Sequence, residues 1–280
     1  MKNVRLIELE LFGYCNRRCS WCPNKFIDRQ SSNFEMDIEV FEKIIQELKE
    51  MDYQGVITFS RYNEPMSLLE LLNERVSYIR KHLPNVKLVM NTNGDFLNRS
   101  SIKSLDIDEL SIMDYDNHGA IWCDMKLSSI NCVTDSVTEK FIYAHYNDMK
   151  VLYALDWSRN NVKKENTLDD RGGIMKDITG LRDKRTKPCM EPTYFIGIDY
   201  NGSVVPCCNI RSDYEGHTDY ILGNVKDKTL SEIYNTLQGR EFRTYTQNGI
   251  FAEGSPCEFC QKNPGRYTKD DAGIEYKESE

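Results

Sequence analysis

Strand-like and helix-like segments alternate along the first two thirds of the chain, and this alternation constrains the fold more than any other feature. Short apolar runs rich in β-branched residues predict strands at 4–11, 55–60, 86–91, 109–113 and 150–155. Two longer segments, 37–51 and 68–83, have the apolar spacing of amphipathic helices. Strands that alternate with helices in this way form right-handed βαβ units around a parallel sheet. The first part of the chain is therefore predicted to be an α/β domain whose chemistry lies at the carboxyl ends of its strands.

The sequence pattern changes near Pro188. Two apolar runs, 194–198 and 204–205, flank Asn201-Gly202, a pair that favours a β-hairpin because both residues tolerate positive φ. Short helices are predicted at 229–234 and 240–245. We expect three parts: a first domain at 1–185, a small α+β domain with a hairpin at 186–266, and a charged, flexible tail at 267–280.

The charge and the cysteine content narrow the possible functions. The 280 residues carry a formal net charge of −8, which gives no general attraction for nucleic acid or for an anionic membrane. No run reaches the roughly 18 apolar residues of a membrane-spanning helix, and the charged N-terminus does not resemble a secretory signal. We therefore expect a cytoplasmic protein with no nucleic-acid or membrane partner. Disulfides are rare in that compartment, so the ten cysteines are expected to be metal ligands or buried thiols.

Three cysteines, Cys15, Cys19 and Cys22, lie within eight residues directly after the first predicted strand. A fourth ligand is missing nearby, because the next cysteine is Cys123. Structural zinc needs four ligands, whereas three thiolates suit a [4Fe–4S] cluster with one iron open to another ligand. A zinc knuckle and chance clustering are the alternatives. Trp21, which precedes the last of the three cysteines, is placed to pack against a cluster.

The segment Cys-Asn-Arg-Arg-Cys-Ser-Trp-Cys resembles the signature of the radical S-adenosylmethionine (SAM) family, in which an aromatic residue precedes the third cysteine. The resemblance implies a partial (β/α)6 TIM-like barrel. It also implies that SAM binds the open iron through its amino and carboxylate groups and is cleaved reductively to a 5′-deoxyadenosyl radical. That radical abstracts hydrogen from an unactivated C–H bond, a reaction that protein side chains cannot perform.

Two further segments match this family in order and spacing. Residues 59–65 stand where family members carry a Gly-Gly-Glu-like segment, and the resemblance implies that Glu64 accepts a hydrogen bond from the SAM amino group. Tyr62, which replaces a glycine there, is expected to line the SAM site. The end of the third predicted strand lies where family members contact the ribose or the carboxylate of SAM, and an ordinary turn is the alternative. Its polar residues are Asn91, Thr92 and Asn93.

Four cysteines in the last third form a second group: Cys189, Cys207, Cys257 and Cys260. The last two have the spacing of a metal knuckle, and the predicted hairpin can fold the first two toward each other. Four thiolates make a closed site, and both zinc and a [4Fe–4S] cluster accept it. The sequence around these cysteines resembles the twitch domain, a short form of the SPASM region. That resemblance implies one auxiliary [4Fe–4S] cluster.

Three cysteines remain outside both groups. Cys208 adjoins Cys207 and could replace it as a ligand. Cys123 and Cys132 have no partner motif and are expected to be buried, inert thiols. The alternative is that one of them completes the auxiliary cluster.

Four residues are catalytic candidates: Arg171, Asp114, Tyr115 and His118. The Arg171 guanidinium can hold a substrate or the SAM carboxylate through two hydrogen bonds, and the two glycines after it let the backbone approach closely. The other three residues follow the fourth predicted strand and can supply a base or hold polar groups of a substrate. A surface turn and a solvated loop are the respective alternatives.

Together these features resemble radical SAM oxidoreductases that hold two clusters. The resemblance implies that the radical takes hydrogen from the substrate and that the auxiliary cluster accepts the second electron. The expected reaction is oxidation of a secondary alcohol of a polyol, sugar or aminocyclitol, with a flavodoxin or ferredoxin as electron donor. The alternative is an enzyme that crosslinks or oxidises a ribosomally made peptide, although Cys15 comes too early for a leader-binding domain before the barrel. A zinc-binding scaffold is the non-enzymatic alternative.

Overall fold

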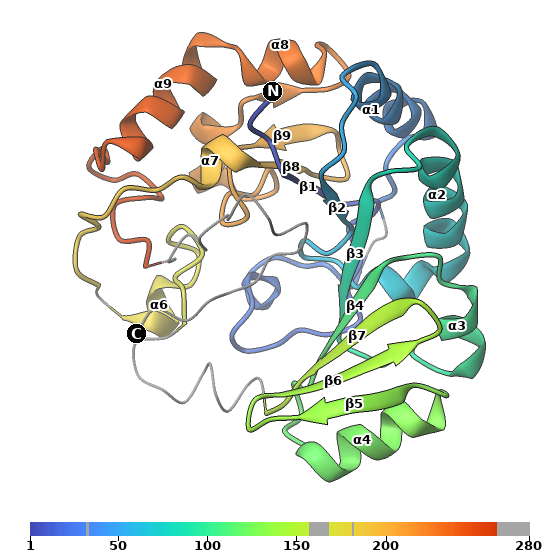
Figure 1. Ribbon diagram of the computed structural model, residues 1–280. Coiled ribbons are helices and arrows are strands. Elements are labelled where there is room, and N and C mark those ends of the chain that lie inside the picture. Colours follow the sequence, from blue (N-terminus) through green and yellow to red (C-terminus); the bar gives the residue numbers. More distant parts are fainter. Residues whose placement is uncertain (32–33, 157–167, 181, 262–280) are drawn as a thin grey trace.

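The structure, a computed structural model, describes residues 1–31, 34–156, 168–180 and 182–261. Within these residues the strands form one mixed sheet in the linear order β10-β9-β8-β1-β2-β3-β4-β7-β6-β5 (Figure 1). The strands are β1 Leu6–Leu9, β2 Val56–Thr58, β3 Lys87–Thr92, β4 Glu109–Met113, β5 Val133–Val137, β6 Phe141–Tyr146, β7 Met149–Ala154, β8 Phe195–Ile198, β9 Ser203–Val205 and β10 Gly223–Asn224. The sheet is open, with β10 and β5 at its edges, and the predicted α/β fold of a partial barrel is confirmed.

The centre of the sheet is parallel. The six neighbours β8, β1, β2, β3, β4 and β7 all run in the same direction. Strands β2 and β8 are buried at every position, which is typical of parallel strands in the middle of a sheet. Because these strands are parallel, the loops that follow β1, β2, β3 and β4 leave from the same edge. This edge carries the first cysteine group, Glu64 and the candidate residues that follow β4.

One edge of the sheet is a hairpin that the sequence analysis missed. Strand β6 lies between β5 and β7 and pairs antiparallel with each of them. Strand β5 reads Val-Thr-Asp-Ser-Val, and four of its five residues are exposed. It therefore lacks the apolar run on which a strand prediction depends.

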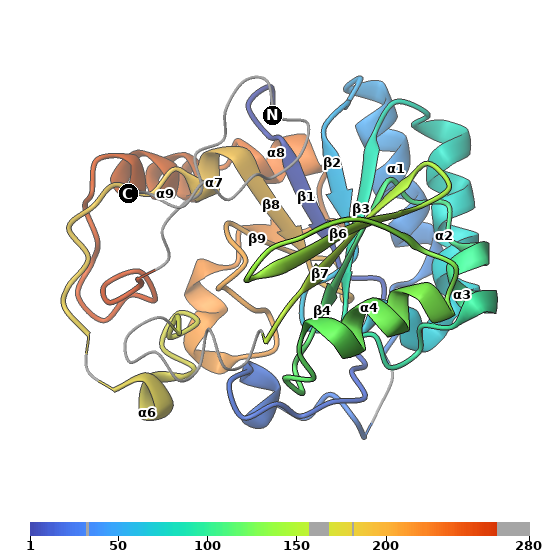
Figure 2. The same ribbon diagram turned by 60° about the horizontal axis from the view of Figure 1, so that its bottom comes forward.

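Some α-helices connect the parallel strands, and others follow the last strand of the sheet. They are α1 Ile38–Glu50, α2 Leu69–His82, α3 Arg99–Ser104, α4 Ala120–Ser129, α6 Lys176–Thr179, α7 Glu191–Tyr194, α8 Leu230–Tyr234 and α9 Leu237–Gln247. Helix α1 buries one apolar face, as its spacing predicted. Figure 2 shows α1, α2, α3 and α4 on one side of the strands, and α7, α8 and α9 beyond β1 and β8. The sequence analysis missed α3 and α4, which are short or weakly amphipathic.

The predicted C-terminal hairpin exists and extends the same sheet. Strand β8 pairs with β9 and also lies parallel to β1, so the sheet continues across the predicted domain boundary near residue 185. The proposed division at that residue thus separates two parts of one sheet. The predicted tail at 267–280 lies outside the described residues. Among the helices that the structure describes, none is long and apolar enough to cross a membrane.

Candidate active site

The first three cysteines lie on the loop after β1, at the carboxyl edge of the parallel strands. All three are free thiols and partly exposed. Burial raises the pKa of Cys15 to about 12 and that of Cys19 to about 11, and the neighbouring cysteines act in the same direction. Thiols that raise one another's pKa lie close together, and a bound iron cluster would hold them as thiolates. The loop therefore fits a [4Fe–4S] cluster with three protein ligands.

Arg17, between the first two cysteines, fastens this loop to two others. Its guanidinium forms ion pairs with Asp95 after β3 (2.5 Å) and with Asp116 after β4 (2.8 Å). Asn93 adds a side-chain hydrogen bond to Asn16 (2.8 Å). The Arg17 contacts could not be predicted from the sequence, because partners 78 and 99 residues away leave no local pattern.

Glu64 lies between the cysteine loop and the end of β3. Its carboxylate accepts hydrogen bonds from the Thr92 hydroxyl (2.6 Å), the Asn93 backbone N–H (2.8 Å) and the Met66 backbone N–H (3.2 Å). Burial raises the pKa of Glu64, although these hydrogen bonds oppose the shift. The carboxylate also acts electrostatically on Cys15. The Glu64 carboxylate therefore has lone pairs left for a further donor, and its contact with the SAM amino group stays a prediction.

Tyr62 and Asn91 differ in their availability to a cofactor. The Tyr62 hydroxyl donates to the backbone carbonyl of Cys208 (2.7 Å), and the Arg211 guanidinium covers its ring, 3.9 Å from the ring centroid. Tyr62 thus joins the loop after β2 to the second cysteine region. Asn91 is exposed and points to the opposite face of β3 from Thr92, which is buried. Both remain predicted cofactor contacts.

The second cysteine group comes together in space. Cys189 precedes α7, Cys207 follows β9, and Cys257 and Cys260 follow α9, yet all four line one cavity. Burial raises the pKa of Cys257 to about 12, with Cys260 and Cys189 acting in the same direction. In the described part of the chain, no three cysteine, histidine or carboxylate side chains converge on a single metal ion. A four-iron cluster does not require such convergence, because each thiolate binds a different iron.

The remaining cysteines lie elsewhere. Cys123 and Cys132 belong to the main apolar core, as expected of inert thiols. The lining of the cavity includes Cys207 and not Cys208. Cys208 instead lies beside Tyr62 and Arg171. This arrangement favours Cys207 over its neighbour as a cluster ligand.

Arg171 lies between the two cysteine groups. It interacts electrostatically with Tyr62, Cys208 and Cys22, and its Nη1 donates to Asn209 Oδ1 (3.3 Å). Its Nε atom is buried without a hydrogen-bond partner among the described residues. A buried, unpaired donor costs free energy that a bound ligand can recover. The Arg171 backbone has φ of +53°, and the following glycines continue this left-handed turn.

The three other catalytic candidates, which follow β4, have different surroundings in the structure. Burial acts to raise the pKa of Asp114. Hydrogen bonds from the backbone N–H groups of His118, Gly119 and Asp156 outweigh burial, so this pKa lies below its usual value. His118 is exposed, bonds to Asp114 through Nδ1 (3.1 Å) and stacks on Trp122. These two residues therefore shape the loop after β4.

Tyr115 is different, because it lies beside the cysteine loop. Its ring is 5.9 Å from that of Trp21, and burial, with Cys22 and Cys19, raises its pKa. Arg171 acts on it electrostatically. Of the three residues after β4, Tyr115 is the one that interacts electrostatically with both the first cysteine group and Arg171.

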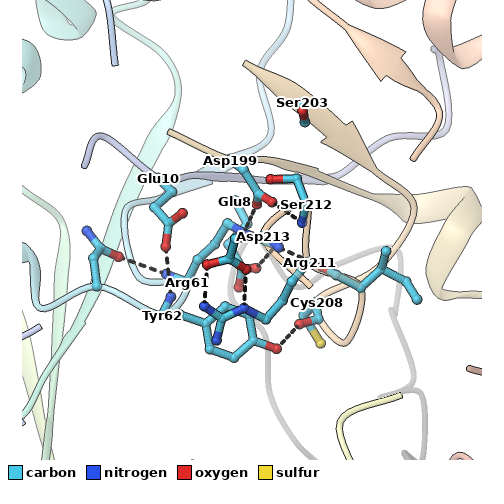
Figure 3. Close-up of polar contacts among 12 residues, drawn as sticks. Glu8, Glu10, Arg61, Tyr62, Asp199, Ser203, Cys208, Arg211, Ser212 and Asp213 are labelled. Atoms are coloured by element: carbon cyan, nitrogen blue, oxygen red, sulfur yellow. Dashed lines mark hydrogen bonds and ion pairs between the residues drawn. The ribbon is translucent and has the colours of Figure 1, made fainter. Parts of the chain in front are cut away.

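A buried ionic network holds the site loops together (Figure 3). Arg61, after β2, pairs with Glu8 of β1 (2.9 Å) and with Asp199 after β8, and it donates to the Ile210 carbonyl (2.8 Å). Neighbouring pairs join the cysteine loop to the segment after β9: Arg29–Glu10 at 3.1 Å, Arg29–Asp213 at 2.7 Å and Arg211–Asp213 at 2.7 Å. The network fixes the second cysteine region relative to the first. None of these ion pairs could be predicted from the sequence.

His217 stabilises the turn that contains Arg171 by a hydrogen bond to the next residue, Gly172. The Arg211 backbone N–H donates to Nδ1 (3.0 Å), so Nε2 carries the proton and donates to the Gly172 carbonyl (2.9 Å). A Cβ on Gly172 would lie 2.9 Å from His217 Nε2, so only glycine fits this contact. Burial lowers the pKa of His217, and the ring is therefore neutral in the folded protein.

The His217 environment predicts a loss of stability in acid. The ring in the unfolded chain protonates near pH about 6.5. The folded-state pKa is lower, so stability is fully present above that pH and falls as the pH drops below it. We expect His217→Gln, which cannot titrate, to lose less unfolding free energy than the unaltered protein between pH about 7.5 and about 5.5. Urea unfolding at both pH values measures this, and an equal loss in the two proteins would contradict it.

Comparison with known families agrees with this geometry. Residues 9–112 match the radical SAM superfamily, and residues 189–261 match SPASM, an iron–sulfur cluster-binding domain. The chain is a radical SAM enzyme with a C-terminal SPASM-type domain. Its cofactors are accordingly SAM and [4Fe–4S] clusters, one of them auxiliary.

Individual relatives support the same class. The chain is 25% identical over 260 residues to the S-adenosyl-L-methionine-dependent 2-deoxy-scyllo-inosamine dehydrogenase of Niallia circulans, covering 92% of this chain and 93% of that protein. Its fold resembles that of BtrN in complex with AdoMet and 2-DOIA, with a TM-score of 0.70, 22% identity and coverage of 92% and 93%. It also resembles native anSMEcpe with bound AdoMet, with a TM-score of 0.54, 14% identity and coverage of 87% and 83%.

Proposed function

We propose that this enzyme oxidises a secondary alcohol of a polyol, sugar or aminocyclitol. The position of Arg171 carries the proposal. Its guanidinium interacts with Cys22 of the first cysteine group and bonds to Asn209, which contacts Cys260 of the second. A small substrate held by Arg171 would therefore face both cluster sites. The Niallia circulans relative, by its name, dehydrogenates 2-deoxy-scyllo-inosamine, which supports this substrate class.

The proposed site divides its residues by role. The SAM-binding cluster is assigned to Cys15, Cys19 and Cys22, and the auxiliary cluster to Cys189, Cys207, Cys257 and Cys260. The SAM contacts are assigned to Glu64, Asn91, Thr92 and Asn93, with Tyr62 as a spacer toward the second cysteine region. When bound, the cofactors supply a radical that removes the carbinol hydrogen and an acceptor for the electron left when the hydroxyl proton departs.

Arg171 has the chemistry that this reaction needs from the protein. Its unpaired Nε and its charge can hold the substrate hydroxyl and stabilise negative charge that develops on that oxygen. Tyr115 is proposed to contact substrate on the side of the first cluster. We further propose that a cytoplasmic flavodoxin or ferredoxin supplies the electron to that cluster.

The test uses full-length enzyme reconstituted with iron and sulfide without oxygen, then supplied with SAM and a reductant. We expect 5′-deoxyadenosine to form together with a product that has lost two hydrogens, when 2-deoxy-scyllo-inosamine and related aminocyclitols and inositols are offered. Deuterium at the carbinol carbon should appear in the 5′-deoxyadenosine. SAM cleavage without oxidation of any of these alcohols, but with oxidation of a peptide, would overturn the proposed substrate class.

Arg171→Lys is the matched variant for the role of this residue. Lysine keeps the positive charge but loses the planar pair of donors. We expect the variant to retain SAM cleavage and both clusters. It should form a smaller amount of the oxidised product at a given substrate concentration. Unchanged product formation would remove Arg171 from the proposed site.

A further inference from the structure

Asn209 connects the proposed substrate side of the site to the second cysteine group. It is 2% exposed, two residues after Cys207. Its Nδ2 donates to Asp169 (2.6 Å) and lies 3.6 Å from Cys260 Sγ. Its Oδ1 accepts from Arg171 Nη1 (3.3 Å). Because arginine only donates and a carboxylate only accepts, these partners fix the amide in one orientation, with one N–H toward Asp169 and the other available to the sulfur.

Arg185 is a second donor to the same sulfur. Its Nη1 lies 3.8 Å from Cys260 Sγ and 3.1 Å from the Cys260 carbonyl oxygen. Arg185 also acts electrostatically on Cys257. Both Asn209 and Arg185 line the cavity of the four cysteines. The Cys260 sulfur thus faces an amide and a guanidinium.

Such donors change how readily a cluster accepts an electron. Reduction from the 2+ to the 1+ state adds one negative charge, which spreads onto the thiolate ligands. An N–H group that points at a thiolate stabilises that charge and raises the reduction potential. A higher potential favours transfer of the single electron that remains on an oxidised substrate radical.

We propose that Asn209 is a positioning residue that raises the reduction potential of the auxiliary cluster and couples that potential to Arg171. The proposal rests on the assignment of Cys260 as a ligand of that cluster. Arg171 holds the Asn209 carbonyl oxygen, and this contact aims the amide N–H at the sulfur. A shift of Arg171 when substrate binds would therefore turn the Asn209 amide and change the reduction potential of the cluster.

The potential itself provides the test. Full-length holoenzyme is poised at a series of potentials, and the EPR signal of the reduced auxiliary cluster is recorded. We expect Asn209→Ala to lower the midpoint potential by about 59 mV, which is a tenfold change in a one-electron equilibrium. Asn209→Asp has the same size and adds a negative charge beside the sulfur, so it should lower the potential further. Asn235, exposed at the end of α8, is the matched control, and Asn235→Ala and Asn235→Asp should leave the potential unchanged.

Coupling is tested by combining two substitutions. Arg171→Lys should lower the potential when Asn209 is present and have a smaller effect in the Asn209→Ala background. Equal effects in both backgrounds would overturn the coupling. A potential unaltered by both Asn209 substitutions, in protein with full iron content, would overturn the tuning role.

The assignment of Cys260 as a cluster ligand is tested separately from the role of Asn209. Cys260→Ala should lose the auxiliary cluster, as measured by iron content and by its EPR signal. If Cys260→Ala keeps both clusters, the ligand set is wrong. If it loses the cluster while Asn209 substitutions leave the potential unchanged, only the role of Asn209 is wrong.

Discussion

Cys19→Ala is expected to abolish reductive cleavage of SAM and to lower the iron content from about eight atoms per chain to about four. The physical reason is that, in the proposed assignment, three thiolates are the whole protein ligand set of the first cluster, and no other cysteine lies on that loop. Without the cluster there is no open iron to hold SAM and no electron to cleave it. Iron analysis and chromatography of 5′-deoxyadenosine after anaerobic reconstitution measure both effects.

Two matched variants separate the clusters. Cys257→Ala should also lower the iron content by half, yet it should keep SAM cleavage and lose the oxidised product, because only the auxiliary site is affected. Cys208→Ala should keep all the iron, because Cys208 does not line the cavity. SAM cleavage by Cys19→Ala at the level of the unaltered enzyme would contradict the first assignment, and loss of iron in Cys208→Ala would contradict the second.

The sequence analysis could predict the central strands and the main helices because each has a local pattern. Helix α1 buries residues at helical spacing, and the strands at the centre of the sheet are short apolar runs. Strand β5 lacks such a pattern, because it is formed by pairing with β6 at an exposed edge. The place of β8 beside β1 was also beyond prediction, since two parallel strands 189 residues apart share no sequence signal.

The site divides in a similar way. The cysteines were visible because their spacing is short or family-specific, and Glu64 was visible through the Gly-Gly-Glu-like segment at 59–65. The residues that set the geometry between the cysteine groups were not visible. Asn209, Arg17 and Arg61 each act through partners more than 35 residues away in the sequence, and an isolated asparagine or arginine has no pattern that marks it. Burial and charge pairing, which identify them, exist only in the fold.

Arg61→Met is expected to cost about 3–5 kcal/mol of unfolding free energy, a large share of the roughly 5–15 kcal/mol that a typical protein possesses. The Arg61 side chain is fully buried, and it lies so close to Gly197 that a Cβ there would collide with its guanidinium. Methionine fills much of the same space but removes the guanidinium that pairs with the buried carboxylate of Asp199 and with Glu8. Urea unfolding of the variant and the unaltered protein, prepared in the same cluster state, measures the loss.

The cause of that loss can be separated from a simple change in packing. Arg80 pairs with Asp106 and Asp108, whose side chains are 71% and 42% exposed, so Arg80→Met should cost no more than about 1 kcal/mol. Adding Asp199→Asn to Arg61→Met removes one of the buried carboxylates that Arg61 neutralises and should recover part of the lost stability. If the double variant is no more stable than Arg61→Met alone, the loss comes from packing and not from buried charge.

Arg61→Met should also loosen the segment after β9, because Arg61 holds the Ile210 carbonyl next to Asn209. Arg61→Met holoenzyme should then show a lowered auxiliary-cluster potential, whereas Arg80→Met should not.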